Sequence, residues 1–149
     1  MRLNLGRYIS KIRNAFDILD NDVANTYFGD ADFSDSRDMV TRATQMANSV
    51  YRGYGNDCSA ISGYLAKVLY IYGCNFNVVV GFAYPAKFKN DPRLTKINGS
   101  IPDMANHCWV NNFSDNVEYH TFHNNYDIVK CREDAILSIN NGQLTCTIL

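Results

Sequence analysis

The sequence predicts an α+β domain in which N-terminal helices pack on an antiparallel sheet. Three segments before residue 73 repeat apolar residues at helical spacing, and the segments after residue 76 are apolar, β-rich runs separated by turn residues. Helices followed by strands, without alternation, are typical of α+β domains. We expect a single domain over 1–149, made of an N-terminal helix and loop over 1–36 and a core over 37–149.

Three helices are expected before the sheet. Apolar spacings of three and four predict a helix over about 4–20 and another over about 37–51, the second capped by Ser34 or Asp35. A third helix over about 58–72 should end at Gly73. The acidic loop over 29–36 lacks the glycine and the terminal glutamate of an EF-hand loop, so we expect no calcium site there.

The sheet should contain a central strand, a hairpin and a C-terminal strand. Residues 77–83 form a β-branched run, which predicts the central strand. The hairpin joins 107–113 to 117–122 through a turn at 114–116, so paired residue numbers should sum to about 229. We then expect a short strand over 126–129, a short helix near 132–139 and a last strand over 144–148. The irregular segment over 84–106 is a candidate substrate wall or lid.

Composition argues against several classes of protein. Hydrophobic residues make up 46% of the chain and charged residues 19%, which is typical of a globular protein. The formal net charge of −1 gives no argument for nucleic-acid binding. No apolar stretch approaches the roughly 20 residues needed to span a bilayer, and no secretion signal is recognisable, so we expect a cytoplasmic protein with no membrane partner. Abundant Asn and Tyr are typical of AT-rich genomes, such as those of many phages.

Cys58 and His107 have the local contexts of a thiol nucleophile and its base. Cys58 opens the third predicted helix, where unpaired backbone N–H groups and the helix dipole favour a thiolate. His107 opens the first hairpin strand, from which its ring can accept and return a proton. The five cysteines are scattered and odd in number, so we expect reduced thiols, with neither disulfides nor a zinc site.

A third polar residue would orient the ring of His107. In the expected register His107 lies opposite residue 122, and His120 is a diagonal neighbour on the same face, so His120 is the first candidate. A shift of one residue would offer Thr121 or His123 instead. The remaining possibilities, if the chain folds back, are Asn124, Asn125 and Asp127. Zinc bound by the three histidines is not expected, because His120 and His123 would lie on opposite faces of a strand.

An acyl intermediate would also need donors for its oxyanion and a wall that excludes water. The backbone N–H of Cys58 is the first expected donor. The side-chain candidates lie just upstream in the sequence and are Asn56, Tyr54 and Tyr51. Trp109 shares a strand face with His107 and is expected to pack beside its ring.

These residues resemble the transglutaminase-like superfamily, which shares its helix-Cys and sheet-His core with papain. The resemblance covers roughly 37–123 and is carried by Gly55-Asn56-Asp57-Cys58 at a helix start, by Gly73, by the strand 78–81 and by His107-Cys108-Trp109-Val110. It implies that Cys58 is the nucleophile and His107 the base. The family usually presents an Asp late in the second hairpin strand, which this chain lacks. A Cys-His-His set is instead similar to bacterial cell-wall endopeptidases of the same clan.

The expected function is that of a cysteine enzyme acting on a peptide or protein amide through thiol acylation. A peptidase, an amidase and a transglutaminase-type enzyme all use this chemistry, and none of them needs a cofactor or a metal here. Two alternatives remain open at this point. One is a catalytically silent binding module on the same scaffold, such as a phage-type inhibitor of a host protein. The other is a cell-wall endopeptidase with a Cys-His-His triad.

Overall fold

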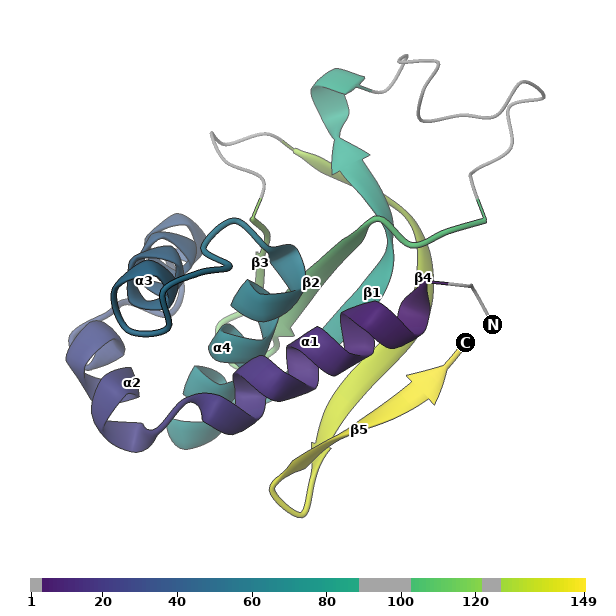
Figure 1. Ribbon diagram of the computed structural model, residues 1–149. Coiled ribbons are helices and arrows are strands. Elements are labelled where there is room, and N and C mark those ends of the chain that lie inside the picture. Colours follow the sequence, from purple (N-terminus) through teal and green to yellow (C-terminus); the bar gives the residue numbers. More distant parts are fainter. Residues whose placement is uncertain (1–3, 89–102, 122–126) are drawn as a thin grey trace.

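The computed structural model describes residues 4–88, 103–121 and 127–149 (Figure 1). These residues form the expected α+β fold, with the helices N-terminal to an antiparallel sheet. The helices are α1 (Leu5–Ile18), α2 (Asn21–Phe28), α3 (Ser36–Ser49) and α4 (Cys58–Ile71). The strands are β1 (Phe76–Pro85), β2 (His107–Asn112), β3 (Val117–Tyr119), β4 (Ile128–Asn140) and β5 (Gln143–Ile148), and a 3-10 turn, Ala86–Phe88, follows β1.

Helix α4 is the most deeply buried of the helices. Ten of its 14 residues are buried, so the expected apolar stripe extends around most of the helix. Its end is fixed as predicted, because Gly73 adopts a φ of 76° and the N–H of Cys74 donates to the carbonyl of Leu69 over 2.8 Å.

Among the described residues, no helix combines the length and the apolar character needed to cross a bilayer.

Helix α1 lies across α4 on one face of the sheet (Figure 1). The two helices come closest at Gly63, where an added Cβ would overlap the carbonyl oxygen of Ile12 and lie 2.7 Å from the Cβ of Ala15. The apolar face of α1 joins the same core cluster as α4, through Leu5, Ile9, Ile12 and Phe16. This close packing brings the N-terminal half of α1 to the start of α4.

The sheet has the order β3-β2-β1-β4-β5, with β1 in the centre. The hairpin register is the predicted one, since Val110 pairs with Tyr119 and Asn111 with Glu118. Strand β3 ends at Tyr119, earlier than expected, and the expected partner of His107 at residue 122 lies outside the described residues. Successive β2 residues face opposite sides of the sheet: Cys108 joins the large core cluster under the helices, and Trp109 a smaller one on the other face.

The predicted helix near 132–139 is wrong, because these residues belong to β4. Good helix formers such as Ala135 and Leu137 favour a helix locally, but both are buried in the cluster under the helices. Ile136, between them, packs on the other face of the sheet. Successive residues of the segment therefore face opposite sides of the sheet, as in a strand. Its backbone N–H and C=O groups form hydrogen bonds with β1. The short strand expected over 126–129 forms the start of β4 from Ile128 onward.

Helix α2 was not expected from the apolar pattern. It has only eight residues and buries only Ala24 and Phe28, which gives too few turns for a clear periodicity. Its local signal is the cap: the side chain of Asp20 accepts the N–H of Val23 over 2.9 Å. The expected helix over about 4–20 ends instead at Ile18, because Leu19 is extended, with a ψ of 122°.

Replacement of Gly63 by alanine tests the close contact between α1 and α4. Alanine favours helix, but its methyl group has no space against the backbone of Ile12, so Gly63→Ala should lower the free energy of unfolding by about 2 kcal/mol. Gly6→Ala on α1 is the matched control, because nothing lies within 4 Å of its added Cβ. Urea denaturation should show the control unchanged or more stable by up to about 1 kcal/mol. Equal stability of the two variants would contradict this packing.

Candidate functional site

Cys58 is the first residue of α4, and Asp57 caps the helix directly before it. One carboxylate oxygen of Asp57 accepts the N–H groups of Ser59 and Ala60 over 2.9 and 3.2 Å, and the other accepts Lys11 Nζ over 2.8 Å. Burial pushes the pKa of Asp57 up, but Lys11, Ser59 and Ala60 together hold it below its usual value. The cap therefore stays ionised and ties the start of α4 to α1. The N–H of Cys58 itself has no partner among the described residues.

The thiol of Cys58 is strongly acidic for a cysteine. Hydrogen bonding from the Cys108 thiol lowers its pKa most; burial opposes this, and the ring of His107 lowers it further, to about 5 from 9.0. At neutral pH Cys58 is therefore a thiolate. Burial raises the pKa of Cys108 well above its usual value, so this thiol remains protonated and acts as a donor. Cys58 and His107, the two residues singled out from the sequence, thus interact directly.

A chain of hydrogen bonds leads away from His107. Its Nε2 lies 3.0 Å from Nδ1 of His120, and Nε2 of His120 lies 3.2 Å from Oε1 of Glu118. The other carboxylate oxygen of Glu118 accepts Lys130 Nζ over 2.6 Å. His120, the expected orienting residue, therefore contacts His107, and Glu118 stands behind it. The sequence placed Glu118 on the same strand face as His120 but gave it no role.

Glu118 fixes the position of the protons along this chain. Hydrogen bonding from His120 lowers the pKa of Glu118 most, burial opposes it and Lys130 lowers it further, to about 2 from 4.5. The carboxylate can only accept, so His120 carries its proton on Nε2. Burial lowers the pKa of His120, which keeps the ring neutral at neutral pH and leaves Nδ1 as an acceptor. His107 must then donate from Nε2, and its Nδ1 is the nitrogen that can exchange a proton with Cys58.

The rings of His107 and His120 are held by Trp109. The indole is fully buried and stacks on both rings, with centroids 5.8 Å from His107 and 5.6 Å from His120. This is the wall expected from the sequence. The strand start is fixed by the neighbouring Asn106, whose side chain accepts the N–H of Ala83 and donates to its carbonyl, over 2.9 and 2.8 Å.

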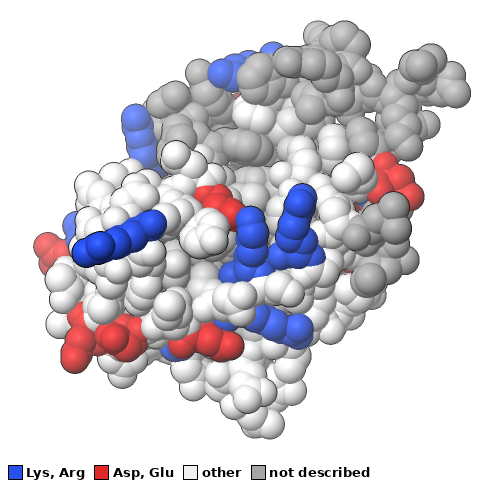
Figure 2. Space-filling model, in the orientation of Figure 1, with Lys and Arg blue, Asp and Glu red and all other residues white. Residues whose placement is uncertain are grey.

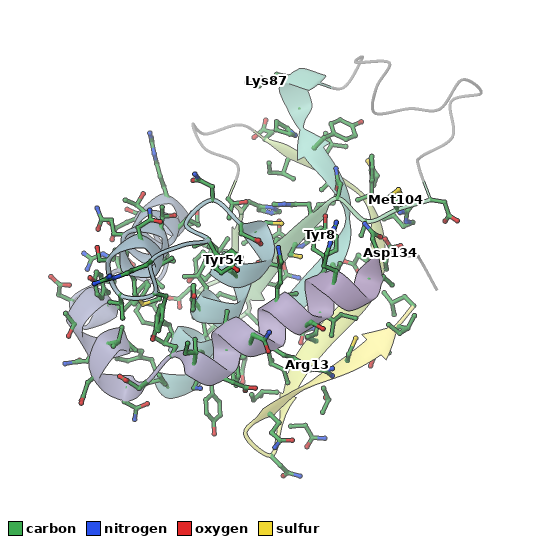
Figure 3. The ribbon with its side chains drawn as sticks, viewed as in Figure 1. Tyr8, Arg13, Tyr54, Lys87, Met104 and Asp134 are labelled. Carbon is green, nitrogen blue, oxygen red and sulfur yellow. The ribbon has the colours of Figure 1, made fainter. Side chains whose placement is uncertain are left out.

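Tyr8 is another site residue that sequence reasoning missed. It lies on α1, on the side that faces the start of α4, and Arg13 lies on the opposite side (Figure 3). Burial raises the pKa of Tyr8 to about 12, and the next cause is the negative charge of Cys58, so the hydroxyl is protonated and close to the thiolate. That hydroxyl has no partner among the described residues. Only the packing of α1 on α4 places it there, and no local motif signals it.

The other expected site residues are distributed unevenly. Asn56 lines a pocket together with Cys58 and Tyr8, whereas Tyr54 and Tyr51 line a separate pocket on the far side of Lys11. Thr121 is half-buried at the end of its described segment, and Asp127 is exposed, with its carbonyl bonded to Ala86. Three further candidates for the third position, His123, Asn124 and Asn125, lie outside the described residues, as does most of the expected wall or lid.

No metal site is evident in the part of the chain that the structure describes. No group of three or more His, Cys, Asp or Glu side chains there could hold an ion.

Selective alkylation tests the acidity of Cys58. At about pH 6, iodoacetamide should modify Cys58 about 10- to 100-fold faster than Cys74, Cys108 or Cys146, because burial raises the pKa of these three thiols. Peptide mapping of a time course measures the rates. Cys146→Ala should leave the fast reaction intact, and His107→Gln should slow it. Modification spread evenly over the thiols would contradict an activated Cys58.

Glu118→Gln tests the far end of the hydrogen-bond chain that runs from His107 through His120 to Glu118. The folded pKa of Glu118 is below its unfolded value, so the carboxylate stabilises the fold above about pH 4.5, and this contribution is lost as the pH falls toward about 2. The difference in unfolding free energy between the native sequence and Glu118→Gln should therefore shrink over that range in urea titrations.

The same variant should slow alkylation of Cys58 at about pH 6 by about two- to fivefold, because the hydrogen-bond chain that orients the ring of His107 loses its terminal carboxylate. Glu133→Gln is the matched control, since Glu133 is an exposed carboxylate on β4. A merely structural role for Glu118 would alter the stability and leave the alkylation rate unchanged.

The chain has been compared with family models, with curated proteins and with solved structures, and none of them matches it. The resemblance to the transglutaminase-like superfamily therefore rests on Cys58, His107 and the residues around them.

Proposed function

We propose that the protein is a cysteine enzyme that transfers acyl groups from a peptide or protein amide. The observation that carries the proposal is the interaction of a thiolate at a helix start, Cys58, with the ring of His107. Catalytic cysteines need a lowered pKa, partial access and a base that can return a proton. Cys58 has a lowered pKa, lines a pocket and has such a base.

The proposed reaction has two steps. Sγ of Cys58 attacks the carbonyl carbon, and the tetrahedral intermediate collapses as His107 Nδ1 gives its proton to the departing amine. This leaves a thioester on Cys58 and a neutral ring. Water or a second amine then attacks the thioester, His107 takes the proton of that nucleophile, and the thiolate is released. His120 and Glu118 act as positioning residues, because they keep Nδ1 of His107 directed toward the thiol.

Two donors are available for the oxyanion of the intermediate. The N–H of Cys58 has no partner in the described part of the chain, and the hydroxyl of Tyr8 is protonated and close to Cys58. Donors of this kind lower the barrier because they are already oriented where charge develops. The expected candidate Asn56 lines the same pocket and could contact the substrate.

The same arrangement supports the resemblance to the transglutaminase-like superfamily at the position where the sequence departs from it. The family presents an Asp near the base. In this chain the carboxylate is that of Glu118, and it acts through the intervening ring of His120. A four-residue chain, Cys58-His107-His120-Glu118, would then perform the work of the usual triad.

An activated ester tests acyl transfer without knowledge of the natural substrate. With 4-nitrophenyl acetate the native protein should form an acetyl thioester on Cys58, detected by intact mass, and should turn it over. Cys58→Ala should do neither, and Cys146→Ala should behave as the native protein. If Cys58 is acetylated no faster in the folded than in the denatured protein, the proposal fails and the non-catalytic binding module is favoured.

Tyr8→Phe separates acyl chemistry from thiol reactivity. Acylation passes through an oxyanion and should slow on the order of 10- to 100-fold. Alkylation by iodoacetamide is a displacement without an oxyanion, so its rate at Cys58 should be unchanged. A parallel loss in both reactions would show that Tyr8 acts on the thiol itself.

A further inference from the structure

The pocket at Cys58 is polar and carries two cationic side chains. It has a volume of about 390 Å³ and is lined by Arg7, Tyr8, Lys11, Asn56, Asp57, Cys58 and Ser59. Three of these residues come from the N-terminal half of α1, and the others from the start of α4 and the loop before it. The space-filling view shows Lys and Arg side chains gathered over α1 on this face (Figure 2).

One of the two cations of the pocket lacks an ion-pair partner among the described residues. Lys11 is paired with Asp57 at 2.8 Å, and the Cys58 thiolate faces His107. Arg7 has no ion pair or hydrogen bond with any described residue. Burial and the negative charges of Cys58 and Cys108 raise the pKa of Tyr8. The guanidinium of Arg7 is close enough to act in the opposite direction and lower it. Within the described part of the chain, the exposed guanidinium of Arg7 thus has no carboxylate partner and shares the pocket with Cys58 and Tyr8.

We infer that the acyl group accepted by Cys58 carries a carboxylate close to the carbonyl that is attacked, and that Arg7 binds this carboxylate. The inference rests on the proposed acyl transfer and names its substrate class, an acidic peptide or another acidic acyl donor. A guanidinium matches a carboxylate with two parallel hydrogen bonds. Lys11 adds positive potential at the rim of the pocket, although Asp57 holds its ammonium.

The position of the Arg7 guanidinium explains why it would favour acyl groups that carry a carboxylate. In the proposed reaction the carbonyl carbon lies at Sγ of Cys58, in the pocket that Tyr8 and Arg7 also line, so a group close to that carbonyl shares the pocket with Arg7. A neutral side chain there would leave the guanidinium exposed without a partner. A second, less polar pocket adjoins at Lys11 and is lined by Tyr51, Tyr54, Tyr64 and the aliphatic residues Ala15, Ile18 and Ala60, which offers an apolar surface beyond the acidic group.

A matched pair of alkylating agents tests the inference. Iodoacetate and iodoacetamide share a leaving group and differ in the carboxylate. The ratio of their rate constants at Cys58 should fall about fivefold in Arg7→Gln, and Arg7→Lys should restore part of it. Arg13→Gln is the control, because it makes the same change in charge on the opposite side of α1 and should leave the ratio unchanged. Equal effects of Arg7→Gln and Arg13→Gln, or no effect of either, would overturn the inference.

Protection by a small diacid identifies the anion. Glutarate should slow the reaction of iodoacetamide with Cys58 saturably in the native protein and weakly in Arg7→Gln, whereas glutaramide should not slow it. Protection by inorganic phosphate as strong as that by glutarate would overturn the assignment to a carboxylate. Slow reaction of Cys58 with iodoacetamide alone would instead reject the proposed acyl transfer, so the two failures are distinguishable.

Discussion

Helix α4 is enclosed by α1, by α3 and by strands β1 and β2, and this enclosure fixes Cys58 and the pocket beside it. The helix can be buried so fully only because α1 approaches it without a side chain between them at Gly63. Its first turn therefore has a fixed position against β2, where Cys108 and His107 lie. The acidity of Cys58 is thus a consequence of core packing as much as of its immediate neighbours.

The half of the site that lies on one helix start and one hairpin could be predicted from the sequence. Cys58 begins a helix because Asp57 caps an apolar run, and the hairpin register follows from its short polar turn. In that register His120 is a diagonal neighbour of His107, and alternate residues of a strand share a face. The contact between the two rings follows from this arrangement. These inferences succeed because each depends on residues close in sequence.

The other half depends on tertiary contacts that no local pattern reports. Tyr8 and Arg7 reach Cys58 only because α1 packs on α4, a contact between residues about fifty positions apart in the sequence. Glu118 lies behind the ring of His120, whereas the family pattern presents an Asp beside the base, so that pattern does not indicate Glu118. In β4, strong local helix propensity was overridden by the open edge of β1.

The order of these residues along the chain has a consequence during synthesis. The groups that make Cys58 acidic, Cys108 and His107, follow it by 50 and 49 positions, and the carboxylate at the end of the proton chain comes later still. A nascent polypeptide that has exposed only its helices carries an ordinary cysteine. The Cys58 thiol becomes acidic only after the hairpin has left the ribosome and paired with β1, so in incomplete chains it should react slowly with alkylating compounds.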